Sequence, residues 1–203
     1  MNQPRQIEKR KAIINAATEM FLESGYAGVS VDGIIAQIGG SKRTIYKYFG
    51  DKDGLFAAIV EQLCEEIVTP LTHMDLKRLS LQEALSTIAH TFLEVLLSPR
   101  TIALHRLIVA EAPRAPASAR TFFNAAPATS YRCLTEYFIW ADGAGLVTPG
   151  DAHARAILFL DALTGDFQLR SLLGLEVPGR VEQNRLIDEA IAVFMKGIAP
   201  TGD

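Results

Sequence analysis

The stretch from Val31 to Phe49, VDGIIAQIGGSKRTIYKYF, constrains the fold more than any other part of this sequence. Apolar residues recur at spacings of three and four in its first half, which predicts a short amphipathic helix with Ser30 as its N-cap. Gly39 and Gly40 then predict a sharp turn, because glycine adopts backbone angles that side chains resist. A second short helix is expected after this turn.

The second helix, expected to begin after Ser41, has one apolar face and one polar face. The polar face carries Lys42, Arg43, Thr44, Tyr46, Lys47 and Tyr48. Lysine and arginine attract DNA phosphates, and arginine, lysine and threonine can also reach base edges in the major groove. Tyrosine hydroxyls can donate to phosphate oxygens. This pattern favours a DNA-reading helix-turn-helix over its alternative, a helical hairpin with a solvated basic face.

Charge is distributed unevenly along the chain, whose formal net charge is −3. Residues 1–52 contain eight Lys or Arg against five Asp or Glu, a net +3, so residues 53–203 carry −6. A chain of this kind would contact DNA through its basic head alone, because DNA phosphates repel the acidic body.

Several classes of function find no support in the sequence. It contains no HExxH, GxSxG, Walker or dinucleotide-binding motif, so we expect no enzyme and no cofactor. Cys64 and Cys133 match no metal or disulfide spacing, and the four histidines lie far apart, so we expect no metal site. The polar start of the chain and the lack of an apolar run of about 20 residues predict a cytoplasmic protein that does not cross a membrane.

The rest of the chain predicts helices separated by glycine and proline, with no strand alternation. The expected helices run from about Ile7 to Ser24, Lys52 to Thr69, Ser80 to Leu97, Pro99 to just before Pro113, Ala128 to Gly143, Ala152 to Leu173 and Arg180 to Gly197. Between Pro113 and Pro127 we expect only a short helical turn around Phe122 and Phe123. The sequence therefore predicts an all-α fold of about nine helices.

The residues from about Arg10 to Phe56 together resemble the DNA-binding domain of the TetR/AcrR family of bacterial transcriptional regulators. The resemblance is carried by Ile13–Ala17, Phe21, Gly25-Tyr26, Ser30-Val31, Ile34, Ser41–Phe49, Asp51–Asp53 and Leu55. Two positions depart from the family pattern: Ile35, where the family usually has alanine, and Gly40, where it usually has an apolar residue. The stretch His105–Arg114, with Gly145-Leu146 and Asp151-Ala152, is similar to the AefR-like C-terminal domain of some of these regulators.

The resemblance implies a three-helix helix-turn-helix domain over residues 1–52 and a helical effector-binding and dimerisation domain over 53–203. It implies a homodimer on a palindromic double-stranded DNA operator, most often a repressor that a small-molecule effector releases. The expected DNA-binding residues are Ser30, Ser41, Lys42, Arg43, Thr44, Tyr46, Lys47, Tyr48 and Lys52. The lysine that matches Lys52 binds phosphate in the resembled family, and the start of a helix adds its own attraction for anions.

An effector pocket would lie among the middle helices of the body. Its candidate lining residues are Phe92, His105, Phe122, Phe123, Tyr131, Tyr137, Trp140 and Phe167. Aromatic rings around a few polar groups are typical of small-molecule cavities and would suit a hydrophobic or amphipathic effector. Each ring can equally be an ordinary core residue.

The last two helices are long and apolar, and in the resembled family such helices pair with their copies in a dimer. The candidate interface residues are Ile157, Leu160, Leu172, Leu173, Ile187, Ile191 and Phe194. The alternative is that these side chains fill the core of the monomer. Pairing has an independent argument, because one recognition helix reads too few base pairs to find a site in a genome.

Two other classes of function stay open. A helical small-molecule carrier or enzyme with an incidental basic face would act independently of Lys42, Arg43 and Lys47. A DNA-binding protein without an effector would have a solid body, with no cavity between its middle helices.

Overall fold

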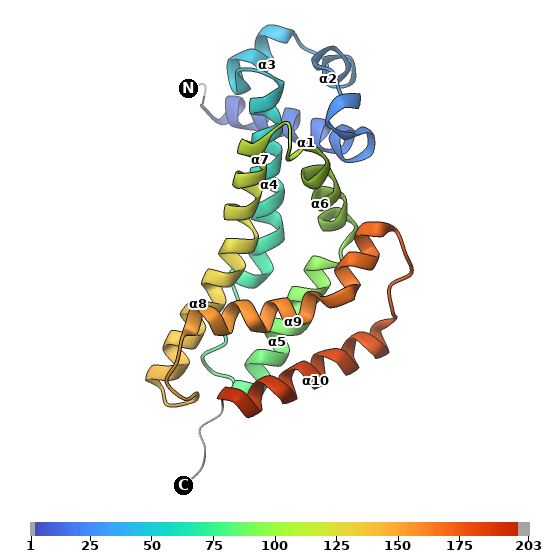
Figure 1. The fold of residues 1–203 in the computed structure, drawn as a ribbon. Helices are drawn as coiled ribbons and strands as arrows, with labels where there is room; N and C mark the ends of the chain where they lie inside the picture. The colour runs from blue at the N-terminus through green and yellow to red at the C-terminus, as the bar shows by residue number, and fades with distance from the viewer. Residues whose placement is uncertain (1–2, 199–203) are drawn as a thin grey trace. The chain divides into compact units, whose positions relative to one another are not determined.

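The computed structural model describes residues 3–198 as an all-α chain with no strand in that range, which confirms the predicted fold class (Figure 1). The helices are α1 (Gln3–Gly28), α2 (Val31–Ile38), α3 (Lys42–Phe49), α4 (Lys52–Thr72), α5 (Leu81–Leu96), α6 (Pro99–Glu111), α7 (Pro116–Ala125), α8 (Pro127–Gly143), α9 (Ala152–Leu173) and α10 (Arg180–Ile198). No helix within these described residues is long and apolar enough to cross a membrane.

The segment after Pro113 contains more helix than the sequence predicts. The expected short turn around Phe122 and Phe123 is the ten-residue helix α7. Prolines that we interpret as breaks in the sequence are helix starts here, because Pro116 and Pro127 open α7 and α8. Proline is favoured at the first position of a helix, where its missing N–H would have had no partner.

The helices form two compact units. Unit 1 combines the chain up to Glu65 with Ala103–Ala125, and unit 2 combines Glu66–Ile102 with the chain from Ala126 onward. Unit 1 therefore contains α1, α2, α3, α7, the first part of α4 and most of α6. Unit 2 contains α5, α8, α9 and α10. The helices α4 and α6 each contribute residues to both units.

Unit 1 has a small apolar core that holds the first helices together. Its fully buried side chains include Ile14, Phe21, Ile34, Ile45, Leu55, Phe56 and Ile59. The rings of Phe21, Tyr26 and Phe56 form a cluster with centroid separations of 5.1 to 5.8 Å. Gly25 interrupts α1 with a φ of 69°, in agreement with the expected helix stop there. This turn lets Tyr26 fold back onto the cluster.

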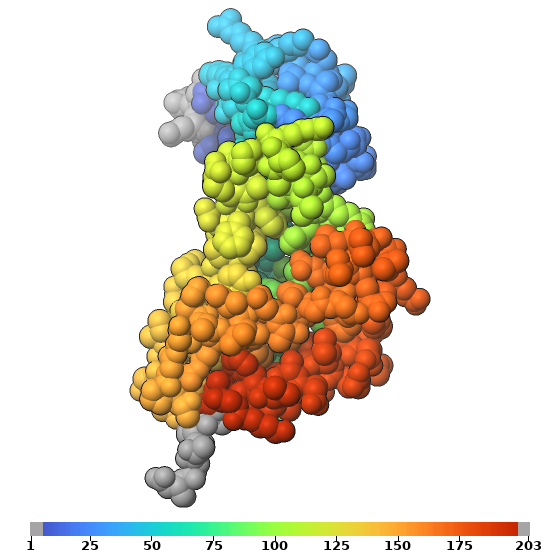
Figure 2. Space-filling view, in the orientation of Figure 1, coloured from blue at the N-terminus to red at the C-terminus, as the bar shows by residue number. Residues whose placement is uncertain are grey.

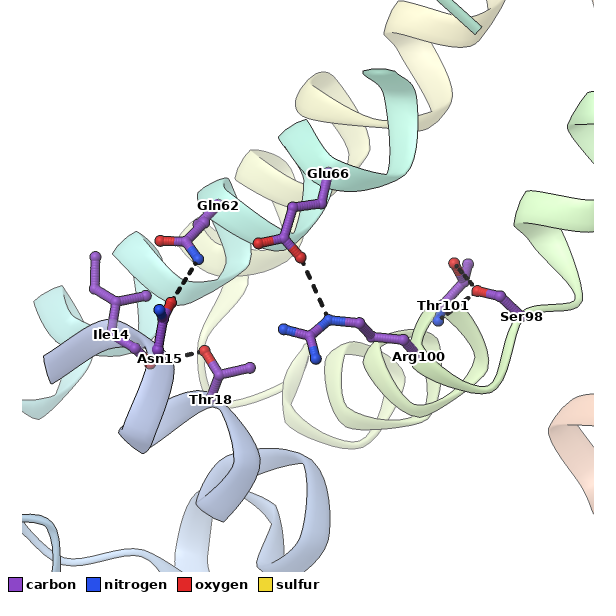
Figure 3. A network of polar contacts seen from close by, with 8 residues as sticks. All are labelled: Ile14, Asn15, Thr18, Gln62, Glu66, Ser98, Arg100 and Thr101. Carbon is purple, nitrogen blue, oxygen red and sulfur yellow. Dashed lines mark hydrogen bonds and ion pairs between the residues drawn. The ribbon is translucent and has the colours of Figure 1, made fainter. Parts of the chain in front are cut away.

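A side-chain hydrogen bond adds to the packing of α4 on α1 within unit 1. The amide nitrogen of Gln62 donates to the amide oxygen of Asn15 at 3.0 Å, as Figure 3 shows. Both side chains lie at the surface, so this bond orients the two helices more than it stabilises them.

Unit 2 is built around a larger core contributed by α5, α8, α9 and α10. Figure 2 shows α9 (orange) and α10 (red) side by side on one face of this unit. The start of α5 carries a capping box, because the Ser80 hydroxyl accepts from the backbone N–H of Glu83 while the Glu83 carboxylate accepts from the backbone N–H of Ser80. Glu66 and Arg100 form an ion pair at 3.4 Å across α4 and α6, visible in Figure 3.

A kink divides α9 at Gly165, whose φ of 43° and ψ of −141° are far from helical values. A side chain at this position would be strained whatever the space around it, since L residues rarely adopt a positive φ. Glycine lowers the stability of a regular helix, but at position 165 it allows a backbone conformation that other residues rarely adopt.

Candidate functional site

The helix-turn-helix of unit 1 consists of α2 and α3, which Figure 1 draws next to each other. Ser30 caps α2, because its hydroxyl accepts from the backbone N–H of Gly33 at 3.0 Å. Ile34 and Ile45 are fully buried and attach the two helices to the core. Each helix thus keeps one face on the core and leaves its other face to the surface.

The turn between these helices requires glycine at both of its central positions. Gly39 has a φ of 71° and Gly40 a φ of 109°, a region that favours glycine. Gly40 is one of the two departures from the family pattern, and this backbone conformation gives it a physical reason. The two glycines fix the path of the chain into α3.

The predicted DNA-binding residues are mostly at the surface. Six of them are exposed: Ser30, Ser41, Lys42, Arg43, Tyr46 and Lys47. Thr44, Tyr48 and Lys52 are half-buried. Tyr46 is 48% exposed, a large fraction for an aromatic side chain on a helix whose opposite face is packed. The structure therefore gathers the cationic, hydroxyl and aromatic groups of α3 on one open face.

Two polar contacts organise the start of α3. Ser41 is at the N-cap as expected, but its hydroxyl lies 3.2 Å from that of Thr44 and makes no bond to a backbone N–H. The Lys42 ammonium pairs with the Asp32 carboxylate of α2 at 2.9 Å, with both side chains more than half exposed. This hydrogen bond and the negative charge of Asp32 raise the pKa of Lys42. A surface pair of this kind adds little stability but holds the ammonium close to α2.

Lys52, unlike the candidate DNA-binding residues of α3, is held by contacts with Tyr26. Its ammonium donates to the backbone carbonyl of Tyr26 at 2.6 Å and lies 4.0 Å from the centroid of the Tyr26 ring. Burial lowers the pKa of Lys52, although nearby Asp53 and Glu111 act to raise it. The Tyr26 hydroxyl donates to the Asp53 carboxylate, so α4 holds the turn after Gly25 from two sides.

Glu111, at the end of α6, is a feature of unit 1 that sequence reasoning does not identify as buried. It is only 8% exposed, and its Oε2 atom is buried with no hydrogen-bond partner among the described residues. From the sequence alone, Glu111 and Arg114 are close enough to form an ordinary surface pair. The helical period of α6 does place Glu111 on the buried face, because the buried residues Leu104, Leu107 and Ile108 precede it by seven, four and three positions.

Two parts of the chain match known protein families. Residues 13–59 match the sequence profile described as "Bacterial regulatory proteins, tetR family", and residues 83–197 match "AefR-like transcriptional repressor, C-terminal domain". The chain belongs to the TetR family of bacterial transcriptional regulators. The predicted resemblance is thereby confirmed for both parts of the chain. The family and its structural neighbours are regulators of transcription, not enzymes.

Individual regulators are similar to this chain over different lengths. The structure is similar to that of the Flavonoid-responsive Regulator FrrA, with a TM-score of 0.85 and 30% identity, covering 96% of this chain and 99% of FrrA. YvkB of Bacillus subtilis (strain 168), an uncharacterized HTH-type transcriptional regulator, is 25% identical over 93% of this chain and 96% of its own length. RutR of Escherichia coli (strain K12), an HTH-type transcriptional regulator, is 33% identical over 63 residues, which is only 30% of RutR.

The eight aromatic effector candidates do not share one unit. His105, Phe122 and Phe123 belong to unit 1, where the His105 ring meets the Phe122 ring edge-on at 4.9 Å and Phe123 is exposed. The other five belong to unit 2: Phe92, Tyr131, Tyr137, Trp140 and Phe167. Among these, Phe92 and Tyr137 line one cavity of about 270 Å³, while Phe167 is a core residue.

The seven candidate interface residues divide by burial. Leu160, Ile187 and Ile191 are buried in the core of unit 2 itself. Ile157, Leu172 and Phe194 are half-buried, and Leu173 is 64% exposed. A further set of large apolar side chains on α9, α10 and their connection is exposed: Leu158, Leu169, Leu175, Val181 and Val193. The sequence does not distinguish them, because α9 and α10 carry apolar residues on more than one face.

No group of three or more potential metal ligands gathers anywhere in residues 3–198.

Proposed function

We propose that this protein is a homodimeric, ligand-responsive regulator that binds a palindromic DNA operator through α3. Residues 1–52 would make the DNA contacts, and residues 53–203 would bind the effector and pair the two copies. In this proposal the protein acts in the cytoplasm as a repressor, released from DNA by a small hydrophobic or amphipathic effector. Membership of the TetR family supports each of these steps, since regulators of this family bind operators and are typically repressors.

The observation that carries the proposal is the open face of α3. Lys42, Arg43 and Lys47 are exposed there beside Tyr46, on a helix that Ile45 anchors to the core. The side chains of such a helix can enter a major groove, where arginine and lysine read guanine and the other cations neutralise phosphates. Lys52 would serve this interface by holding the fold behind it, given its bond to the Tyr26 carbonyl.

Pairing of two copies would use the exposed apolar side chains of α9, α10 and their connection. Leu158, Leu169 and Leu173 are each more than half exposed, and Val181 is 87% exposed. Several large apolar side chains on neighbouring helices are typical of a surface that another protein covers. A symmetric pair would present two copies of α3 to two half-sites of one operator.

The effector response would depend on α4, which starts at Lys52 in unit 1 and ends in unit 2, where Leu71 and Thr72 line the cavity. An effector changes the DNA affinity only by its difference in affinity for the DNA-competent and DNA-incompetent states. FrrA is named as flavonoid-responsive. That name favours an aromatic effector for this chain as well.

The test is a binding titration of the purified protein with the DNA upstream of its own gene. We expect tight binding that weakens steeply between about 50 and 200 mM salt, by roughly 10³-fold or more if two heads together neutralise six or more phosphates. Random DNA of the same length and composition is the control. Equal affinity for the two DNAs would contradict the proposal.

Pairing is tested separately by the mass of the protein in solution. The variant Leu173→Asp places a charge on the proposed surface and should give monomers in light scattering at micromolar concentration. The matched control is Ile139→Asp, which changes an equally exposed apolar residue on α8. A wild-type mass equal to that of one chain, or a monomer produced only by the control, would contradict pairing through α9 and α10.

A further inference from the structure

The cavity of about 270 Å³ in unit 2 has both apolar and polar residues in its wall. The end of α4, the segment that leads to α5, and the helices α5, α8 and α9 all contribute to it. The main apolar residues of the wall are Leu71, Leu76, Ile88, Phe92, Leu134 and Leu160. A volume of about 150 Å³ is enough for benzene, so this cavity has room for about two fused aromatic rings.

Three uncharged polar residues of the cavity lining come from a single helix. Ser130, Cys133 and Tyr137 lie on α8 at spacings of three and four, and thus on one face, and all three line the cavity. The Ser130 hydroxyl already donates to the Ala126 carbonyl at 3.1 Å. Its oxygen can still accept a hydrogen bond, so α8 offers a row of uncharged polar groups to the cavity.

Tyr137 is the least satisfied group of this row. Only 5% of the residue is exposed, and its buried hydroxyl has no hydrogen-bond partner among the described residues. Buried tyrosine hydroxyls usually find a partner, because an unpaired one loses its hydration without compensation. The Tyr137 ring also packs in tilted arrangements against the rings of Trp140 and Phe138, with centroid separations of 5.6 and 5.8 Å, which restricts its movement.

The charged residues of the lining do not make the interior charged. The Asp75 carboxylate pairs with Arg78 and the Glu136 carboxylate pairs with Arg132, and all four side chains are mostly exposed. The Lys77 ammonium lies 5.9 Å from the Trp140 ring and is exposed as well. A charged ligand would thus lose its hydration in the cavity without gaining a buried counter-ion.

We propose that this cavity binds an uncharged, planar aromatic molecule of about two rings whose hydroxyl or carbonyl group pairs with the Tyr137 hydroxyl. The rings would pack on the apolar wall around Phe92, and the polar edge would face α8. This inference rests on the proposed function, in which the same cavity receives the effector. It adds the charge, size and polar group of the ligand and the residue that recognises it.

The test is calorimetric titration of the full chain, without DNA, with 2-naphthol as a neutral probe and 2-naphthoate as its anionic counterpart. We expect the wild type to bind 2-naphthol at least about tenfold more tightly than 2-naphthoate. Tyr137→Phe should weaken 2-naphthol binding about 5- to 20-fold, since it removes one buried hydrogen bond. Binding of 2-methylnaphthalene, which has no polar group, should be equal in the two proteins.

Tyr131→Phe is the matched control. Tyr131 lies on the same helix, but its hydroxyl donates to Asp161 at 2.8 Å and the residue does not line the cavity. Its removal should leave the affinity for 2-naphthol unchanged. A second measurement needs no variant: 2-naphthol should slow the alkylation of Cys133, which lines the cavity, as followed by mass spectrometry of the peptide that contains it.

Three results would overturn the inference: no binding of 2-naphthol, equal binding by wild type and Tyr137→Phe, or tighter binding of 2-naphthoate. Because the titration contains no DNA, each of these leaves salt-dependent operator binding intact as a separate finding. A different result is also informative: 2-naphthol binds in a way that depends on Tyr137, but operator affinity does not change. This result supports the ligand site and contradicts only the proposed release from DNA by the effector.

Discussion

Two helices of this protein, α3 and α8, carry their polar side chains in opposite ways. On α3 the polar groups point to solvent and the apolar residue Ile45 is buried, so the helix can offer charge to a large polyanion. On α8 a row of polar groups lines a cavity, and Tyr137 is buried with a hydroxyl that has no partner among the described residues. Exposed polar groups cost little stability and are free to bind, whereas buried ones must be satisfied or remain a cost. Substitutions on α3 should therefore change DNA binding alone, whereas the effect of a substitution on α8 should depend on whether the polar group that it removes already has a partner.

The largest effect is expected when the cations of α3 are removed together. The triple variant Lys42→Ala, Arg43→Ala, Lys47→Ala should lower DNA affinity by roughly 10²- to 10⁴-fold and reduce the salt slope by about 1 for each phosphate that the protein no longer neutralises. Its melting temperature should stay within a few degrees of the wild type, because all three side chains are exposed. Anisotropy titrations at several salt concentrations measure the first quantity and thermal denaturation the second.

The control for this variant removes as many cations from unit 2, at the exposed residues Arg132, Arg185 and Lys196. A similar loss of DNA affinity in this control would mean that net charge, and not the face of α3, determines binding.

Arg43 and Tyr46 divide the face of α3 into base reading and phosphate contact. Arg43→Ala should relax the preference for one operator base pair by about 1–3 kcal/mol, whereas Tyr46→Phe should weaken binding to all sequences similarly. A set of operators, each with one changed base pair, measures both effects. An unchanged operator preference in the Arg43 variant would exclude base reading by that residue.

Lys52 tests whether a cation beside α3 must itself touch DNA. Lys52→Met keeps most of the stem but loses the donor to the Tyr26 carbonyl, so we expect the free energy of unfolding to fall by about 1–2 kcal/mol. The salt slope of DNA binding should not change, because this ammonium faces the protein. A slope reduced by about 1 with unchanged stability would instead assign Lys52 a phosphate contact.

Sequence patterns predict unit 1 more completely than unit 2. The spacing around Ile34 and Ile45, the Ser30 cap and the glycine turn are local signals, and each corresponds to a feature of the structure. The pairing of Lys52 with the Tyr26 carbonyl joins positions that are 26 residues apart and has no local signal. Short sequence patterns thus predict the helices and which of their faces are exposed. Contacts between helices that are distant in sequence become visible only in the folded structure.

In unit 2 the apolar residues of α9 and α10 show why burial is harder to predict than helix. Leu160 and Leu158 are two positions apart on the same helix, yet one lies in the core and the other is 64% exposed. The buried residues of α9 are Ala156, Phe159, Leu160, Leu163 and Phe167, which recur at helical spacing across the kink at Gly165. The exposed leucines lie on the other face, so residue type alone does not indicate which apolar side chains are buried. The same limit applies to the aromatic candidates, which share a residue type but not a location.

The two tyrosines of α8 give the smallest predicted effect and the sharpest test of the buried polar row. Tyr131→Phe removes the bond to Asp161 and should lower the free energy of unfolding by about 1 kcal/mol, whereas Tyr137→Phe should leave it unchanged or raise it. Burial and the bond to Asp161 raise the pKa of Tyr131 to about 12. The contribution of this hydroxyl to the free energy of unfolding is therefore complete below pH 10 and is lost as the pH rises to about 12. Urea denaturation at pH 8 and pH 11 measures both effects. If Tyr137→Phe proved as destabilising as Tyr131→Phe at pH 8, the Tyr137 hydroxyl would already be satisfied and would not await a ligand.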